Sequence, residues 1–165
     1  RASGSGGRQQ RIDPKYGNVF DHFNIVYEYA NGVKAFARCR HLRGCANDVT
    51  DHIFGSKARV DVMRHRIYDL KGKMIWRFKG RSKSMYQVEH DEFFASIRSG
   101  KPINNGDYMT KSTMLAIMGR MVGYTGKQLS WEQALNSKED LRPKKYAWGD
   151  LAVAPVAIPG VTPFV

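Results

Sequence analysis

The sequence predicts an α+β fold, with an open, largely antiparallel β-sheet and helices packed on one face. β-prone runs fill the first half of the chain and helical patterns fill the second, an order typical of this fold class. Asn31 and Gly32 lie between two β-prone runs, and both residue types tolerate the positive φ of a tight hairpin turn. The 165 residues, 42% of them hydrophobic, are enough for one packed domain spanning 1–165.

Residues 1–17 are predicted to form an N-terminal arm and the first strand. The stretch 3–7 contains only serine and glycine, so we expect it to be locally flexible. Gly4 and Gly6 begin a GxGxxG pattern, but Gln9 occupies the third position and no helical pattern follows, so no dinucleotide-binding loop is predicted. The chain starts with arginine rather than methionine, from which we expect an upstream part.

The hairpin register follows by counting from the turn. If Asn31 and Gly32 are the two loop residues, Ala30 faces Val33 and side chains alternate between two faces. One face is then aromatic and cationic, with the pairs Tyr29–Lys34, Tyr27–Phe36, Ile25–Arg38 and Phe23–Arg40. This face could form a subunit interface or could pack against helices of its own domain.

Further strands are predicted over 48–54, 58–70 and 73–79, which together make a meander. A helix beginning near Met85 has an apolar stripe and ends at Gly100, and a second helix over 108–124 is apolar enough to be buried. Ser130 and Gln133 form a capping box before a short third helix. Four prolines then predict an extended tail over 143–165.

The net charge of +12 and the pI near 9.9 raise the question of a nucleic-acid partner. Lysine and arginine are scattered along the chain and accompany no nucleic-acid-binding motif, so we predict no such partner. No apolar run is long enough for a membrane span, and no membrane partner is predicted. Cys39 and Cys45 lack paired CxxC spacing and are expected to be free thiols.

Candidate site residues lie at the hairpin end away from its turn. His22, His41 and Cys39 share a predicted face and would suit zinc, but no CxxC or HxxxH anchor is present and no metal site is predicted. His22 and His52 are better candidates for acid–base or substrate-hydroxyl contact.

Arginines near the same end add hydrogen-bond donors. Arg40 and Arg43 precede a loop that leads through Asn47 to the strand bearing His52. Their alternative role is purely structural, through ion pairs with nearby aspartates or stacking on Phe23. The phosphate-binding loop, HExxH and GxSxG motifs do not occur, so we expect no catalytic residue in this chain.

In order, these segments resemble the C-terminal domain of Gfo/Idh/MocA oxidoreductases, in its bacterial subtype. The matching runs are Gly-Gly-Arg-Gln-Gln-Arg at 6–11, Tyr-Gly-Asn-Val-Phe-Asp-His-Phe at 16–23, Tyr-Glu-Tyr-Ala-Asn-Gly at 27–32, Cys-Arg at 39–40, Gly-Ser-Lys at 55–57, Tyr-Gln-Val-Glu-His-Asp at 86–91, Ile-Arg-Ser-Gly-Lys-Pro at 97–102, Lys-Ser-Thr-Met at 111–114, Gly-Arg-Met at 119–121 and Trp-Glu-Gln-Ala-Leu-Asn-Ser at 131–137. The resemblance extends over nearly the whole chain.

The resemblance implies a two-domain enzyme that transfers hydride between NAD or NADP and a sugar or polyol. The nucleotide would be bound mainly by an N-terminal Rossmann domain, which this chain does not contain, and no cofactor is expected here. The family's Glu-Lys-Pro motif is also absent from the sequence. What carries over is a substrate wall and an interface for dimers or tetramers, with Arg40, Arg43, Asn47, His52 and His22 as substrate contacts.

Two alternatives remain open from the sequence. The parent could be an NAD-dependent glycoside hydrolase of the same fold, or the chain could be a non-catalytic dimerisation module. The compartment is also open, between the bacterial cytoplasm and the periplasm.

Overall fold

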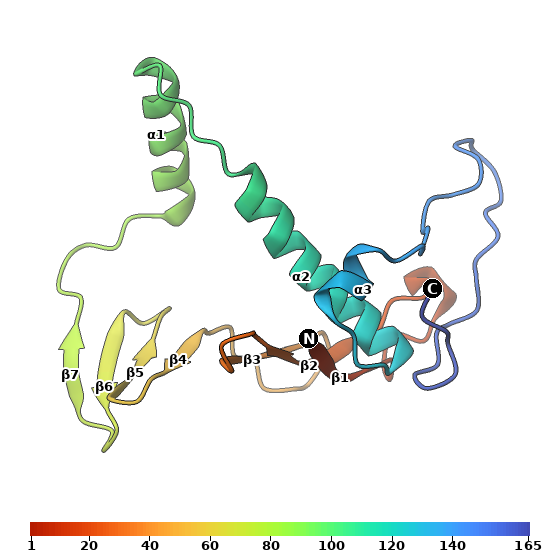
Figure 1. Cartoon of the computed structure of the whole chain (residues 1–165), viewed down its shortest axis with the longest axis horizontal. Helices are drawn as coiled ribbons and strands as arrows, with labels where there is room; N and C mark the ends of the chain where they lie inside the picture. The colour runs from red at the N-terminus through yellow and green to blue at the C-terminus, as the bar shows by residue number, and fades with distance from the viewer. The chain divides into compact units, whose positions relative to one another are not determined.

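The computed structural model describes all 165 residues, which divide into two compact units. The first unit comprises Arg1–Gly44 and Asn105–Val165, and the second comprises Cys45–Asn104. Each contains one antiparallel sheet, of three and four strands respectively, so the fold is α+β (Figure 1). One core had been expected, but the strands of the second unit pair only with one another, and this divides the chain.

The elements of the two units are as follows. The first unit contains β1 (Ala2–Gly7), the 3-10 helix η1 (Pro14–Tyr16), β2 (His22–Glu28), β3 (Lys34–Arg40), α2 (Gly106–Thr125) and α3 (Trp131–Leu135). The second contains β4 (His52–Phe54), β5 (Ala58–Asp61), β6 (Arg66–Asp69), β7 (Met74–Arg77) and α1 (Met85–Arg98). No helix combines the length and apolar composition that a membrane crossing requires.

β1 is a regular strand, not the flexible segment expected from its serines and glycines. It pairs with β2 from Ala2 to Gly7. A Cβ at Gly4 would lie 2.3 Å from the carbonyl oxygen of Asn24, and one at Gly6 would lie 2.9 Å from the ring of Phe23. Small residues are therefore required because β2 lies so close to this strand.

The β2–β3 register differs by one residue from the predicted one. Glu28 pairs with Lys34, so the loop contains Ala30, Asn31 and Gly32. Only Gly32 has positive φ, at 81°, as in a three-residue turn with a left-handed last position. A shift of one residue exchanges the faces of one strand relative to the other.

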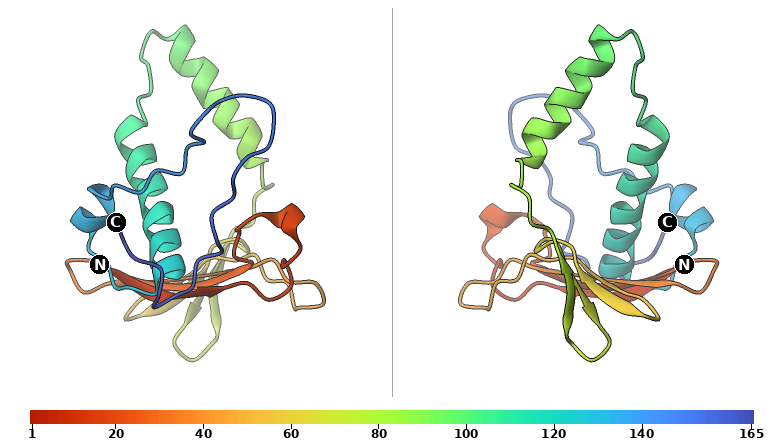
Figure 2. Two further views of the ribbon diagram at one scale, coloured as in Figure 1. Left: turned by 90° about the vertical axis from the view of Figure 1, so that its right-hand side faces the viewer. Right: turned by 90° about the vertical axis from the view of Figure 1, so that its left-hand side faces the viewer.

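The corrected register gives the three-stranded sheet one apolar and one polar face. Phe23, Ile25 and Tyr27 of β2 now share a face with Cys39, Ala37 and Ala35 of β3. This face lies against α2, whose Gly119 and Gly123 approach the β2 side chains closely (Figure 2). The predicted aromatic and cationic face does not exist, because aromatic residues and arginines lie on opposite sides.

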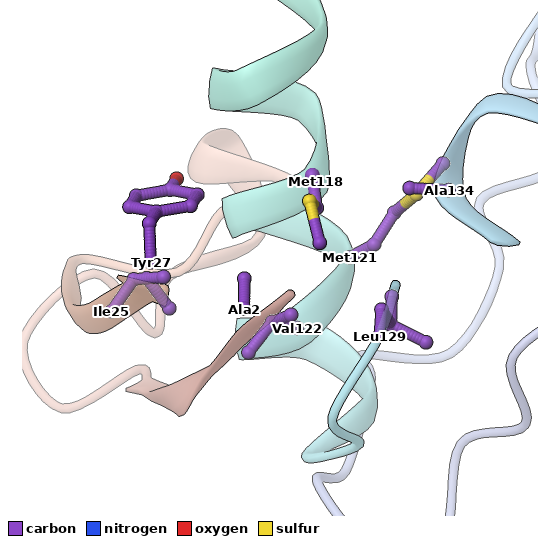
Figure 3. Close-up of a cluster of buried hydrophobic side chains, with 8 residues drawn as sticks. All are labelled: Ala2, Ile25, Tyr27, Met118, Met121, Val122, Leu129 and Ala134. Atoms are coloured by element: carbon purple, nitrogen blue, oxygen red, sulfur yellow. The ribbon is translucent and has the colours of Figure 1, made fainter. Parts of the chain in front are cut away.

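The core of the first unit lies between β1, β2 and the C-terminal half of α2 (Figure 3). Met118 and Val122 are fully buried, and each buried side chain of this size stabilises the fold by about 1.5–3 kcal/mol. The remaining core residues are Ala2, Ile25, Tyr27, Met121, Leu129 and Ala134. Burial of the whole second helix was expected, yet the first turns of α2, including Tyr108 and Met109, are exposed.

The end of the chain follows the prediction closely. Ser130 and Gln133 form the capping box of α3. Residues 143–165 contain no helix or strand, as predicted for a proline-rich tail. The tail is fixed at its end, because Phe164 packs against the core and the carbonyl of Val165 accepts a hydrogen bond from Ser137.

The second unit is the predicted meander, with strands in the order β4-β5-β6-β7. The single strand expected over 58–70 is interrupted at Val62–His65, where His65 has a φ of 51°. The sheet therefore has one more hairpin than predicted. Helix α1 begins at Met85 and stops before Gly100, as predicted, but its apolar stripe, including Tyr86 and Phe93, remains exposed.

Candidate functional site

The polar face of the three-stranded sheet is the best-organised candidate site in the first unit. We call it the open face; it comprises the side chains of β1–β3 that point away from α2: Ser3, Ser5, Gly7, His22, Asn24, Val26, Glu28, Lys34, Phe36, Arg38 and Arg40. Two of its cross-strand rows carry polar groups, one being Ser5–Asn24–Arg38 and the other Gly7–His22–Arg40.

His22 is held from both sides. Its Nδ1 lies 2.8 Å from Oδ1 of Asp21. Its ring lies over Gly7, where an added Cβ would come within 2.8 Å of Nε2. An ionised carboxylate only accepts hydrogen bonds, so Nδ1 donates to Asp21 and the Nε2 of the neutral ring is an acceptor. The imidazole is one-third exposed and can reach a ligand at the sheet surface.

Asp21 is a buried carboxylate at the start of β2. Its Oδ2 accepts hydrogen bonds from the backbone N–H groups of Gln9, Gln10 and Arg11, at 2.7–3.0 Å. Burial acts to raise the pKa of Asp21, but the hydrogen bonds from Arg11, His22, Gln10 and Gln9 outweigh it and hold the pKa far below the usual aspartate range. Asp21 is therefore ionised at neutral pH.

The loop around Asp21 also fixes the segment after β3. The side-chain amide of Gln10 accepts from the backbone N–H of Arg43 at 2.7 Å and donates to its carbonyl at 3.2 Å. The guanidinium of Arg11 donates to the carbonyl of His41. Arg43 is therefore placed by its backbone, close to the loop rather than in a strand row.

Two predicted site residues belong to the second unit. Asn47 lies in an exposed loop before β4. His52 contacts the hydroxyl of Thr50 through Nε2 at 3.1 Å, and β4–β7 place it in a row with Asp61, Arg66 and Arg77. In that row Asp61 is buried, and its Oδ1 has no hydrogen-bond partner.

Of the five residues predicted from the sequence, two share one surface. His22 and Arg40 are paired across β2 and β3, whereas Arg43 follows the sheet and Asn47 and His52 lie in the other unit. The sequence reading missed Asp21, Asn24 and Arg38 as members of the site. An aspartate directly before His22 was visible, but its role depends on backbone N–H groups ten or more residues away, which no local pattern indicates.

The chain's own residues do not fit a nicotinamide dinucleotide. Every strand pair is antiparallel, and β1 leads into a loop and η1 rather than into an α-helix. The pyrophosphate cradle of a dinucleotide site needs a strand, a glycine-rich turn and a helix N-terminus in succession. No group of three or more histidine, cysteine or acidic side chains is arranged to hold a metal ion. Cys39 in particular lies on the face opposite to His22.

Comparison with protein-family models, curated proteins and solved structures found no match to this chain.

Proposed function

We propose that this chain is the substrate-binding and oligomerisation domain of an NAD(P)-dependent oxidoreductase that acts on a sugar or polyol. The carrying observation is the open face, on which a buried carboxylate orients His22 beside Asn24 and Arg40. Sugar hydroxyls both donate and accept hydrogen bonds, and this set supplies imidazole, amide and guanidinium groups within two adjacent rows. The nucleotide would be supplied by a Rossmann domain outside this chain.

The oligomerisation role is supported by the four-stranded sheet. Ile53, Val60, Ile67 and Trp76 form one row across β4–β7. Ile53 and Trp76 at its two edges are 59% and 50% exposed, which is unusual for a row of large apolar side chains. We propose that this row contacts another subunit, forming a dimer or tetramer.

Sugar binding is tested by titrating neutral sugars and polyols into ¹⁵N-labelled chain and following backbone amide shifts. We expect saturable shifts that cluster at His22, Asn24 and Arg40. His22→Ala should weaken binding about tenfold, as expected for loss of a hydrogen bond to a ligand hydroxyl. His90→Ala, which removes an exposed histidine of α1, is the matched control. Shifts spread evenly over the chain, or none, would refute the substrate role of the open face.

Oligomerisation is tested separately by light scattering. We expect at least a dimer for the unaltered chain and a shift toward monomer for Trp76→Lys. Trp148→Lys, at a fully exposed tail position, should leave the mass unchanged. Dimerisation without any sugar binding would instead favour a non-catalytic assembly module.

A further inference from the structure

The open face carries positive charge that its own carboxylate does not neutralise. Glu28 is its single acidic side chain, and the guanidinium of Arg1 already donates to both oxygens of that carboxylate, at 3.0 and 3.1 Å. Arg38 is exposed and forms no ion pair within the chain. The polar rows therefore present guanidinium groups with no acidic side chain beside them.

The geometry of β3 concentrates this charge. Arg38 and Arg40 are two residues apart in one strand, so they lie on the same side about 7 Å apart along it. Asn24 and His22 are their cross-strand partners. A guanidinium presents a planar set of donors that matches a carboxylate or phosphate, and it accepts no hydrogen bond. A neutral sugar would use only part of this donor excess.

A second copy of the same face is a poor counterpart. In a two-fold contact through the open face, each cationic patch would lie against a patch of the same sign, because both subunits contribute the same residues. Like charges brought together at an interface disfavour the contact. An anionic ligand satisfies the arginines without this cost.

We propose that the sugar or polyol bound at the open face carries an anionic group, a carboxylate or a phosphate, which Arg38 and Arg40 bind. Asn24 and His22 then contact the hydroxyls of the same molecule. This inference rests on the proposed substrate role of the open face and adds the chemical class of the substrate.

The experiment compares four probes at one pH and one ionic strength, using amide shifts of the ¹⁵N-labelled chain. The probes are D-glucuronate, D-glucose 6-phosphate, D-glucose and inorganic phosphate. We expect one or both anionic sugars to bind at least tenfold more tightly than glucose, since a charge-assisted hydrogen bond is about twice as strong as a neutral one. Their relative affinities distinguish a carboxylate from a phosphate.

Variants at Arg38 localise the preference. Arg38→Ala should remove most of the difference between anionic and neutral sugar, and Arg38→Lys should retain part of it, because the charge remains while the planar donor pair is lost. Lys111→Ala is the control: it removes one cation from an exposed site on α2, outside the open face. A fold check by circular dichroism accompanies each variant.

The outcomes separate this inference from the proposed function. Equal affinity for glucose and both anionic sugars would overturn the inference while leaving sugar binding intact. No binding of any sugar would overturn both. Phosphate binding as tightly as glucose 6-phosphate, with the same amide shifts, would reduce the face to a simple anion site and would also overturn the inference. An anionic preference unchanged in Arg38→Ala would remove Arg38 from it.

Discussion

At the scale of single residues, Asp21 joins stability to site geometry. One carboxylate accepts from three backbone N–H groups and also from the ring of His22. The loop at Gln9–Arg11 and the orientation of the imidazole therefore depend on the same charged group. Loss of that charge should affect both, which makes Asp21 the most informative single position in the first unit.

Asp21→Asn is expected to lower the free energy of unfolding at pH 7 by about 2–4 kcal/mol, because buried N–H donors lose acceptors. The native pKa of Asp21 lies below its unfolded value of about 3.9, so its stabilisation is complete above about pH 5 and is lost as the pH falls below that. Urea unfolding from pH 7 to pH 3 should show a smaller acid loss in the variant. Asp107→Asn, exposed on α2, is the control, and identical pH slopes for Asp21→Asn and the unaltered chain would contradict this account.

Gly7 is predicted to keep the ring of His22 flat against the sheet. In Gly7→Ala the new methyl would meet Cε1 at 2.7 Å and Nε2 at 2.8 Å, so the ring must move. We expect a large change in the ring resonances of His22 and weaker sugar binding. Gly55→Ala, whose methyl would meet only an ordinary contact at 3.4 Å, should change neither. An unmoved His22 ring in Gly7→Ala would show that the close contact is not real.

At the scale of elements, the packing of α2 on the three-stranded sheet depends on two glycines. The hydroxyl of Tyr27 donates to the carbonyl of Leu115 at 2.9 Å and passes directly over Gly119. Gly123 lies against the ring of Phe23 in the same way. A helix with larger residues at these positions would stand farther from the sheet and would bury less of β2.

Gly119→Ala tests this packing, since its methyl would come within 2.2 Å of the Tyr27 hydroxyl oxygen. Alanine favours a helix over glycine by up to about 1 kcal/mol, but overpacking costs about 1–3 kcal/mol, so we expect net destabilisation. Thermal unfolding followed by circular dichroism should show a lower Tm. Ser112→Ala, exposed on the same helix, should not lower it. A raised Tm for Gly119→Ala would show that the helix tolerates a wider spacing.

At the scale of the whole molecule, the division into two units has a consequence for unfolding. Each unit has its own sheet, and the strands of one do not pair with those of the other. Most of the buried apolar side chains lie in the first unit, while the second exposes large residues such as Ile53 and Trp76. The two units should therefore differ in stability, and a single two-state transition is not expected.

Tryptophan fluorescence can report the units separately. Trp76 lies in the second unit, whereas Trp131 and Trp148 lie in the first. In urea, Trp76→Phe should leave one transition at higher denaturant concentration, and Trp131→Phe combined with Trp148→Phe should leave one at lower concentration. Coincident transitions in the two variants would show that the units unfold as one.

Local chemistry was sufficient to predict most elements from the sequence. The capping box at Ser130 and Gln133, the end of α1 before Gly100 and the α+β fold all rest on contacts between near neighbours in sequence. Such signals are short in range and are written in consecutive residues.

What only the tertiary structure decided depends on groups distant in sequence. The turn at Gly32 set the hairpin register, and through it which residues share the open face with His22. The burial of Asp21, the role of Gly7 and the separation of His52 from His22 all follow from long-range strand pairing. A one-residue change in register reverses a face, so no count along the chain could settle the site without the fold that fixes the register.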